Sequence, residues 1–391
     1  MLEIRIYDDE SPLAEQYAEG LRNIGDLHVE RLEDSVFASE IENLMERRRH
    51  WRSDGCLGDS TSIFDGLDVL VIDFDLLEAT AAGELIVASG EDVAYLVRCF
   101  SSCRFVLGMN LPLYRENGFD LTLRGHLESY ADLNIASDQL ANTGLWSQAF
   151  QKYRPWHWPV IPEYLREYER RLEDARDLDA PIHRIIGLPQ ERMARLPRTT
   201  GEFLGGAPEE ATLRGFVRES GNGLLPKDAP EADCDEEVLA RIAAARLAKW
   251  IERRLLPGQD ILVDAPHLVS RFPSLLRGSP DTIEDWNATA RLDAKGANSV
   301  TEELVSGSRL ERPHWVSRPT WLWDQVRECE QIAEVREPWS VELPNWSFCE
   351  DTSRFCADAR QFRADLESPY SLRYVRRLEK VRYRPVSRLL G

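Results

Sequence analysis

The first third of the chain alternates apolar runs with amphipathic stretches. Residues 69–72 are an uninterrupted aliphatic run, which is typical of a strand buried on both faces of a parallel sheet. Similar strands are predicted over residues 2–7, 27–32 and 104–109. Apolar positions at helical spacing predict helices between them, over residues 11–24, 36–49 and 92–103. Strands and helices that alternate in this way predict an α/β domain with a parallel sheet.

The fifth strand of this sheet has two candidate positions, residues 120–123 and residues 130–135. Both are short apolar stretches that follow the fourth predicted strand. Either of them completes a five-stranded sheet, so we expect residues 1–150 to form one domain.

Beyond residue 150 the pattern becomes mainly helical. Residues 152–159 are dense in aromatic residues and Pro, which predicts a packed linker. Helical spacing of apolar residues predicts helices over 162–178 and 236–256. The stretch 195–235 is rich in Gly and Pro and predicts a long loop. We therefore interpret residues 151–391 as a mixed, mainly α-helical domain with an interaction or effector role.

The composition is that of a folded protein with more than one domain. The chain has 391 residues, of which 43% are hydrophobic, and its 11 Trp and 13 Phe argue against disorder. Seven scattered Cys without a Cys-x-x-Cys pair indicate reduced thiols in a cytoplasmic protein. We expect no signal peptide, and no apolar run reaches the ~20 residues that span a bilayer. Arg replaces Lys almost throughout, which indicates a GC-rich bacterial genome.

Carboxylates follow two of the predicted strands. Asp8 and Asp9 come directly after the first strand, and Asp73 ends the third. If these strands are neighbours, the three carboxylates meet beyond the carboxyl ends of the strands, where open α/β sheets bind ligands. Such a group requires a cation or raised pKa values, and oxygen-only ligands suit Mg²⁺. The alternative is that these are solvated acids in ordinary strand-end turns.

This arrangement resembles the receiver domain of two-component response regulators over residues 1–145. In receivers an acidic pair after the first strand, here Asp8 and Asp9, holds Mg²⁺. An aspartate at the end of the third strand, here Asp73, accepts a phosphoryl group. The resemblance implies a flavodoxin-like α/β fold and a role in signal transduction.

The sequence departs from the receiver pattern at several positions. Receivers have a Lys after the fifth strand, but residues 1–151 contain none. The fourth strand runs into Gly108–Leu111 instead of a Ser or Thr, and Phe74–Leu77 replaces the usual Met-Pro after the phosphoacceptor. Residues 47–62 have the position of an insertion. The resemblance therefore implies a degenerate receiver that retains the metal pocket and has lost the conformational relay. Such a module is expected in a non-catalytic regulatory or adaptor protein that docks protein partners, as in bacterial signalling or defence systems.

Two enzyme hypotheses compete with this interpretation. The sequence Asp73–Asp75 after an apolar run also resembles the first motif of the haloacid-dehalogenase phosphatases, whose two aspartates are nucleophile and general acid. That resemblance implies an Mg²⁺-dependent phosphatase-like activity at the acidic group, although those enzymes also use a Lys. Alternatively, Asp264 and His267, which follow the predicted strand 261–263, form an acid–base pair for an activity of the second domain.

Charge is distributed unevenly along the chain. Residues 1–151 hold 28 acidic residues and 11 Arg, a net charge of −17, whereas residues 360–391 hold nine bases and three acids. We expect no nucleic-acid binding by the acidic part, and we interpret the basic run 47–52 as cations at a helix C-terminus. The basic segment near residue 391 is predicted to contact protein through Arg373, Arg376, Arg377, Arg382 and Arg384.

Overall fold

The computed structural model describes residues 1–74, 76, 80–81, 84–85, 89–110, 131–149, 160–201, 204, 207–218, 235–256, 261–272, 275–276, 282–289, 305–330, 332, 347–349, 354–356, 362–364 and 374–376. They belong to two compact units. The first unit includes Met1–Trp146 and Leu225–Ile242, and the second includes Ser147–Leu224 and Ala243–Lys380.

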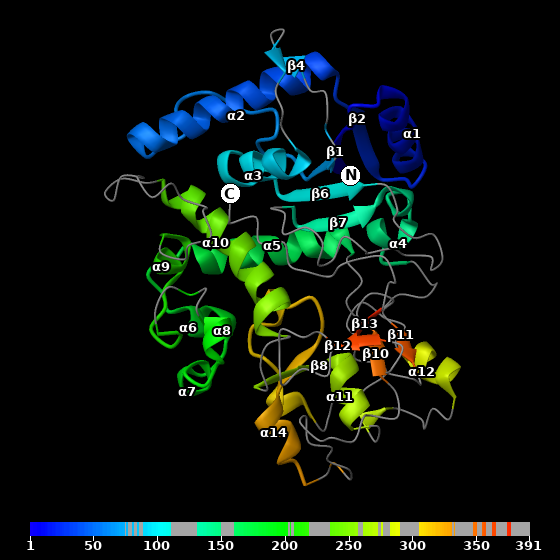
Figure 1. The fold of residues 1–391 in the computed structure, drawn as a ribbon, viewed down its shortest axis with the longest axis vertical. Helices are drawn as coiled ribbons and strands as arrows, with labels where there is room; N and C mark the ends of the chain where they lie inside the picture. Colours follow the sequence, from blue (N-terminus) through cyan, green and yellow to red (C-terminus); the bar gives the residue numbers. More distant parts are fainter. Residues whose placement is uncertain are drawn as a thin grey trace. The chain divides into compact units, whose positions relative to one another are not determined.

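The first unit is built around a five-stranded sheet (Figure 1). The strands are β1 (Leu2–Tyr7), β2 (Leu27–Arg31), β3 (Val69–Asp73), β6 (Phe105–Asn110) and β7 (Leu133–Ala136). They lie side by side in the order β2-β1-β3-β6-β7, and every neighbouring pair is parallel. Counted along the chain, this order is 2-1-3-4-5. The predicted α/β class is therefore confirmed for this unit, with a reversal of strand order between β1 and β3.

The two central strands are the ones with the strongest apolar pattern. Residues 69–72 of β3 are all fully buried, and Ile4 and Ile6 of β1 are at most 1% exposed. In the parallel register Tyr7 lies opposite Ile72, so the two strands end at the same level. Of the two candidate fifth strands, residues 130–135 overlap β7, and residues 120–123 lie outside the described residues.

Helices connect the strands of the first unit. They are α1 (Ser11–Arg22), α2 (Asp34–Asp54), α3 (Gly90–Phe100), α4 (Thr143–Trp146) and the short 3-10 helix η1 (Ser137–Gln139). A hairpin of two-residue strands, β4 (Thr80–Ala81) and β5 (Glu84–Leu85), precedes α3. Helix α1 packs on β1 and β2, whereas α3 packs on β3, β6 and α2 (Figure 1). A capping box of Ser89 and Asp92 fixes the start of α3.

Helix α2 is longer than the predicted helix over residues 36–49. It continues to Asp54 and ends at Gly55, whose φ of 72° suits glycine. Arg47 and Trp51, in the basic run, are buried inside the unit. Arg47 pairs with Asp65 at 2.7 Å and donates hydrogen bonds to the carbonyl oxygens of Ser60 and Phe100. The interpretation of this run as helix-terminal cations is therefore wrong for Arg47, which links α2 to Ser60, Asp65 and Phe100.

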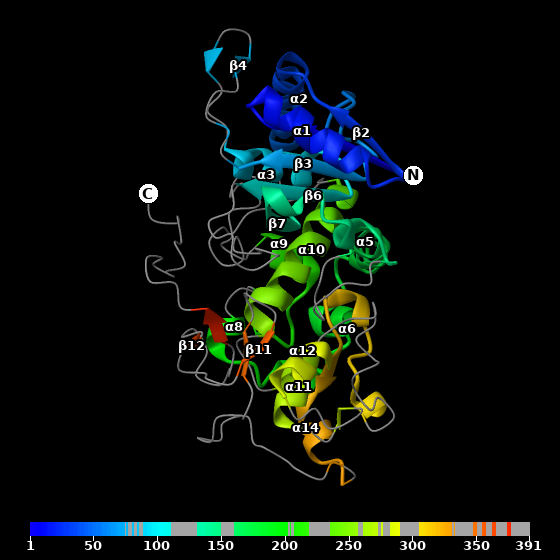
Figure 2. The ribbon, with the colours of Figure 1, turned by 90° about the vertical axis from the view of Figure 1, so that its right-hand side faces the viewer.

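The second unit is mainly helical (Figure 2), and its described strands form two small sheets. Its helices are α5 (Ile161–Ala175), α6 (Ile182–Ile186), α7 (Gln190–Met193), α8 (Arg198–Gly201), α9 (Leu213–Arg218), α11 (Ala265–Arg271), α12 (Ile283–Thr289) and α14 (Trp323–Arg327). Helix α10 (Glu236–Trp250) continues into the π-helical segment η3 (Ile251–Leu255), and the division between the units falls within α10. Two 3-10 helices are η5 (Ser306–Ser308) and η6 (Pro313–Trp315).

The strands of the second unit are short. An antiparallel pair consists of β8 (Leu262–Asp264) and β9 (Thr320–Leu322). A four-stranded sheet has the order β11-β10-β13-β12, formed by β10 (Ser347–Cys349), β11 (Arg354–Cys356), β12 (Phe362–Ala364) and β13 (Tyr374–Arg376). The core of this unit is dominated by aromatic side chains, among them the buried Phe272, Trp286, Trp321, Trp323 and Phe348.

The sequence predicted a long loop over residues 195–235, but two short helices, α8 and α9, lie within it. Residues 219–234 of that stretch lie outside the described residues. Within the part of the chain that the structure describes, every helix is too short or too polar to cross a bilayer.

Candidate metal centre

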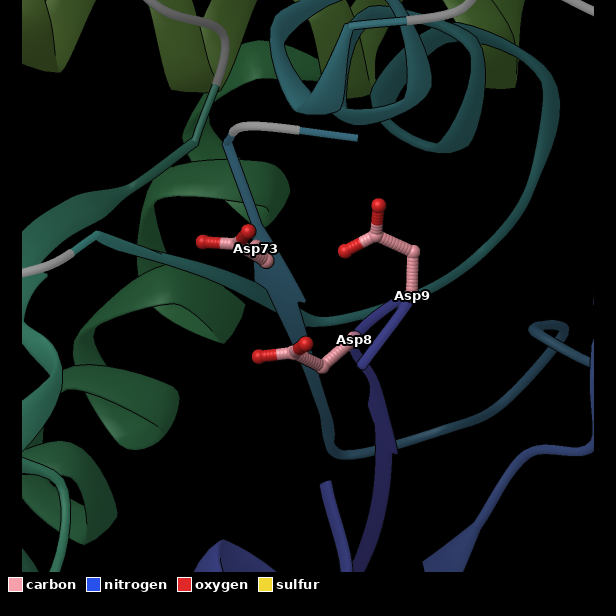
Figure 3. A group of neighbouring side chains, drawn as sticks. All are labelled: Asp8, Asp9 and Asp73. Atoms are coloured by element: carbon pink, nitrogen blue, oxygen red, sulfur yellow. The ribbon is translucent and has the colours of Figure 1, made fainter. Parts of the chain in front are cut away.

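Three carboxylates lie where β1 and β3 end. Asp8 and Asp9 directly follow β1, and Asp73 is the last residue of β3 (Figure 3). The two strands are hydrogen-bonded neighbours in parallel, so their carboxyl ends lie at the same edge of the sheet. This edge is also the point where the strand order reverses, which is the usual ligand position in open α/β sheets.

The carboxylates are close enough to share one cation. One carboxylate oxygen from each of Asp8, Asp9 and Asp73 lies within 4.8 Å of the others. Asp8 is buried, and Asp9 and Asp73 are partly exposed, so the site has an open side toward solvent. Hard divalent cations such as Mg²⁺ take oxygen ligands and keep several waters, and this donor set fits such an ion.

Asp8 is the most constrained of the three. Its Oδ1 accepts a hydrogen bond from the backbone N–H of Glu10 at 2.9 Å, which favours the charged form. Burial nevertheless raises the pKa of Asp8 above its usual value, and the charges of Asp9 and Glu10 add to this effect. A bound cation would act in the opposite direction, because it stabilises the carboxylate.

Tyr7 connects this site to α2. Its ring is buried and stacks on Phe37 of α2, with ring centroids 3.5 Å apart. The pKa of Tyr7 lies far above its usual value, chiefly because of burial and then because of the charges of Asp34, Asp9 and Asp8. The phenol therefore stays neutral beside the acidic site. Asp34, the first residue of α2, is a further acid near Tyr7, and the sequence pattern did not indicate it because it does not directly follow a strand.

Phe74, the residue after Asp73, remains hydrogen-bonded to the neighbouring strand β6. Phe74 donates its backbone N–H to the carbonyl oxygen of Met109 at 2.9 Å. Its ring lies so close to Gly108 that a Cβ added there would overlap the ring, and would come within 2.8 Å of the Asn134 side-chain oxygen. Gly108 is the fourth residue of β6 (Phe105–Asn110), a little before the position where receivers have a Ser or Thr. A side chain at Gly108 is therefore excluded by Phe74.

A cationic partner for a phosphoryl group is missing from the expected position. The fifth strand of the sheet, β7, is followed by η1 with the sequence Ser-Asp-Gln. Residues 1–151 contain no Lys. The sequence indicated that the Lys of receivers is missing, and the corresponding position is therefore the end of β7.

The alternative pair in the second domain is also brought together. His267 Nδ1 lies 2.5 Å from Asp264 Oδ1, and Arg318 Nε lies 3.1 Å from Asp264 Oδ2. Asp264 is fully buried, and the His267 and Arg318 side chains are 8% and 3% exposed. The sequence did not indicate Arg318, which is 54 positions away from Asp264 along the chain. The geometry is that of a buried ionic network, and its burial disfavours access by a substrate.

The predicted protein-contact residues near the C-terminus fall almost entirely outside the described residues. Arg376 is the last residue of β13, whereas Arg373, Arg377, Arg382 and Arg384 lie outside the described residues. The chain matches no protein-family model, no curated protein and no solved structure. Among the described residues, Asp8, Asp9 and Asp73 are the group of carboxylates that could hold a metal ion.

Proposed function

We propose that the first unit is a flavodoxin-like module of the receiver type that has kept its cation site. Three features support this assignment. The sheet has the 2-1-3-4-5 strand order of flavodoxin-like folds, including receivers. An acidic pair follows the first strand, and a single aspartate ends the third. The meeting of Asp8, Asp9 and Asp73 at the reversal of strand order is the observation that carries the proposal.

In this module the three aspartates hold Mg²⁺ through one oxygen each. The ion supplies positive charge that offsets the repulsion among the carboxylates. Asp8 is fixed by Glu10 N–H, so it provides a preformed ligand, while the more exposed Asp9 and Asp73 complete the group.

The protein acts as a non-catalytic regulatory or adaptor protein that docks a protein partner, as expected for a bacterial signalling or defence system. Two features argue against a working phosphoryl switch. There is no Lys in residues 1–151 to bind phosphoryl oxygens, and the fourth strand runs into Gly108–Leu111, which contains no Ser or Thr. A module that has lost the conformational relay of receivers still has its surface. That surface is sufficient to dock a protein partner.

Affinity capture from the native host tests this function. The full chain is immobilised with and without Mg²⁺, and captured proteins are identified by mass spectrometry. Wild type and Asp9→Asn are compared, with Asp59→Asn, an exposed acid distant in sequence from the site, as matched control. A specific partner whose capture by wild type and the control depends on Mg²⁺, and whose capture by Asp9→Asn is weak, supports the proposal.

A second assay distinguishes the adaptor from a phosphatase. The full chain is incubated with para-nitrophenyl phosphate and acetyl phosphate in the presence of Mg²⁺. We expect no turnover. Hydrolysis that requires Mg²⁺ and is lost in Asp73→Ala would show that the acidic group is the active site of a phosphatase, and would overturn the adaptor proposal.

A further inference from the structure

One segment of the second unit, Arg312–Arg318, is held by acidic side chains from three separate elements. The first is Asp174 in the last turn of α5. Its Oδ1 accepts a bond from Arg312 at 2.9 Å. Its Oδ2 lies 2.6 Å from His314 Nε2 and 3.1 Å from Trp315 Nε1. One carboxylate therefore binds three side chains of the segment, which fixes the position of η6 against α5.

The other two acids bind the end of the segment. Glu252, in the π-helical segment η3, accepts the backbone N–H of Ser317 at 2.5 Å. Asp264, at the end of β8, pairs with Arg318 at 3.1 Å. The backbone after the segment joins β9, so these contacts also set the start of the β8–β9 pair.

Arg171 adds a cation to this arrangement. It is 3% exposed, and its Nε donates to the carbonyl oxygen of His314 at 2.5 Å. Its Nη2 lies 3.3 Å from Glu167, one helical turn earlier in α5. The guanidinium also lies over the Tyr164 ring, 4.8 Å from the centroid. Arg171 thus links the segment directly to Glu167.

Glu167 lies among charges of both signs. Glu163 and Arg170 are near it on α5, and Glu252 faces it from η3, in addition to Arg171. The pKa of Glu167 is raised to about 7, chiefly by burial, with Glu163 and Glu252 adding to the rise and Arg171 and Arg170 opposing it. The carboxyl therefore changes charge near neutral pH.

We propose that the protonation state of Glu167 controls how firmly the Arg312–Arg318 segment is held. When Glu167 is neutral, it does not repel Glu252, and Glu252 keeps the Ser317 N–H. Arg171 is then directed to the carbonyl oxygen of His314. When Glu167 is ionised, it attracts Arg171 Nη2 more strongly, away from the contact of Arg171 Nε with the His314 carbonyl oxygen, and it places a second negative charge next to Glu252. The segment is therefore closed at mildly acid pH and loosens as the pH rises.

The direction in which the stability of the closed segment changes with pH follows from proton linkage. The closed state holds an extra proton on Glu167 between its ordinary pKa of 4.5 and about 7. Opening releases this proton, so the stabilisation by Glu167 is complete at the acid end of this range and is lost as the pH rises through it. His314 acts in the opposite direction. Burial lowers its pKa, with Arg171 and Arg312 contributing and Asp174 opposing, so its effect is to stabilise the closed state as the pH rises toward 6.5.

Hydrogen exchange measured by mass spectrometry tests the proposal on the full chain. Protection of peptides that cover residues 312–318 is measured from pH 5 to pH 8.5 and corrected for the intrinsic exchange rate at each pH. The Glu167 side chain is 36% exposed, so solvent screens part of the effect. We expect protection to fall about tenfold across this range, the equivalent of one pKa unit. In Glu167→Gln this fall is absent, and protection stays high at pH 8.5.

Glu173→Gln is the matched control, because Glu173 lies on the same helix with a side chain that is 73% exposed and pairs only locally with Arg176. It should behave as wild type. Equal protection of wild type at both ends of the pH range, or an unchanged pH dependence in Glu167→Gln, overturns the proposal. Carbon NMR of labelled Glu carboxyl groups is an independent check on the wild-type chain. A Glu167 signal that titrates near pH 4.5, assigned by its loss in Glu167→Gln, also overturns it.

Discussion

The ring of Phe74 lies directly over Gly108 of the neighbouring strand. Phe74 follows Asp73, and its backbone N–H is bonded to the carbonyl oxygen of Met109, so the backbone after β3 is held against β6. A Cβ at Gly108 would overlap two ring atoms of Phe74. Phe74, next to the acidic site, is therefore packed tightly against β6. Glycine is required at position 108 because a side chain would have no space, not because of the backbone conformation.

The first prediction follows from this packing. Gly108→Ala is expected to lower the free energy of unfolding by about 1–3 kcal/mol, because it overpacks a filled core. Chemical denaturation followed by Trp fluorescence measures the change. Gly307→Ala is the control, since a Cβ at Gly307 meets no atom within 4 Å. The double variant Phe74→Leu/Gly108→Ala should recover part of the loss. Equal stability of Gly108→Ala and wild type would show that Phe74 does not occupy this space.

The second prediction concerns Asp8 and the cation. Because burial and neighbouring acids raise the pKa of Asp8 in the folded protein, its contribution to stability falls as the pH rises through the range between the ordinary and the raised value. Above that range, without Mg²⁺, Asp8→Asn should raise the melting temperature, since it removes a buried negative charge and keeps an oxygen for the Glu10 N–H. Added Mg²⁺ should raise the melting temperature of wild type and leave Asp8→Asn almost unchanged.

Thermal unfolding at pH 7.5, with Mg²⁺ varied from zero to 20 mM (about the range of weak sites), measures both effects. Asp59→Asn, which changes an exposed acid of the same unit, controls for general charge. If wild type and Asp8→Asn respond equally to Mg²⁺, the acidic group is not a metal site.

Much of the acidic site follows from the sequence by simple rules. The aliphatic run at residues 69–72 and the strand over residues 2–7 have patterns typical of strands, and acids follow both. Placing the acids together then requires only that the two strands are parallel neighbours. Asp34, at the start of α2, was missed, because its proximity to Tyr7 depends on how α2 is packed, through Phe37 on Tyr7.

Long-range polar contacts were not predictable in the same way. Arg47 belongs to a basic run that the sequence predicts to be cations at a helix C-terminus. Its side chain is instead buried and pairs with Asp65. Asp174 and His314 are separated by 140 positions, and Asp264 and Arg318 by 54. Hydrophobic periodicity reports which face of an element is buried, but it contains no information on which charged partners meet across the chain.

The third prediction is that Asp73 is a poor phosphoacceptor. A phosphoryl group on Asp73 would lack the charge-assisted contact that a Lys provides, because residues 1–151 contain none. We expect little modification by acetyl phosphate with Mg²⁺, and no large change of oligomeric state. Intact-protein mass spectrometry and size-exclusion chromatography measure these. A stable, stoichiometric mass increase that is absent in Asp73→Ala would contradict the prediction.

The last prediction concerns the basic segment near the C-terminus, whose residues 377–391 lie outside the described residues. Residues 360–391 carry nine bases and three acids, against a net charge of −17 on residues 1–151. The acidic part repels a polyanion, and at a Debye length of about 8 Å the basic segment offsets this only locally. Binding through phosphate contacts would also fall steeply with salt, whereas a protein interface with Arg and Tyr at its desolvated centre retains more affinity. We therefore predict no binding of duplex DNA or RNA at about 150 mM salt, which is near physiological ionic strength. Electrophoretic mobility shift at low micromolar protein is the measurement, and a clear shift that is abolished by deleting residues 373–391 would refute the prediction.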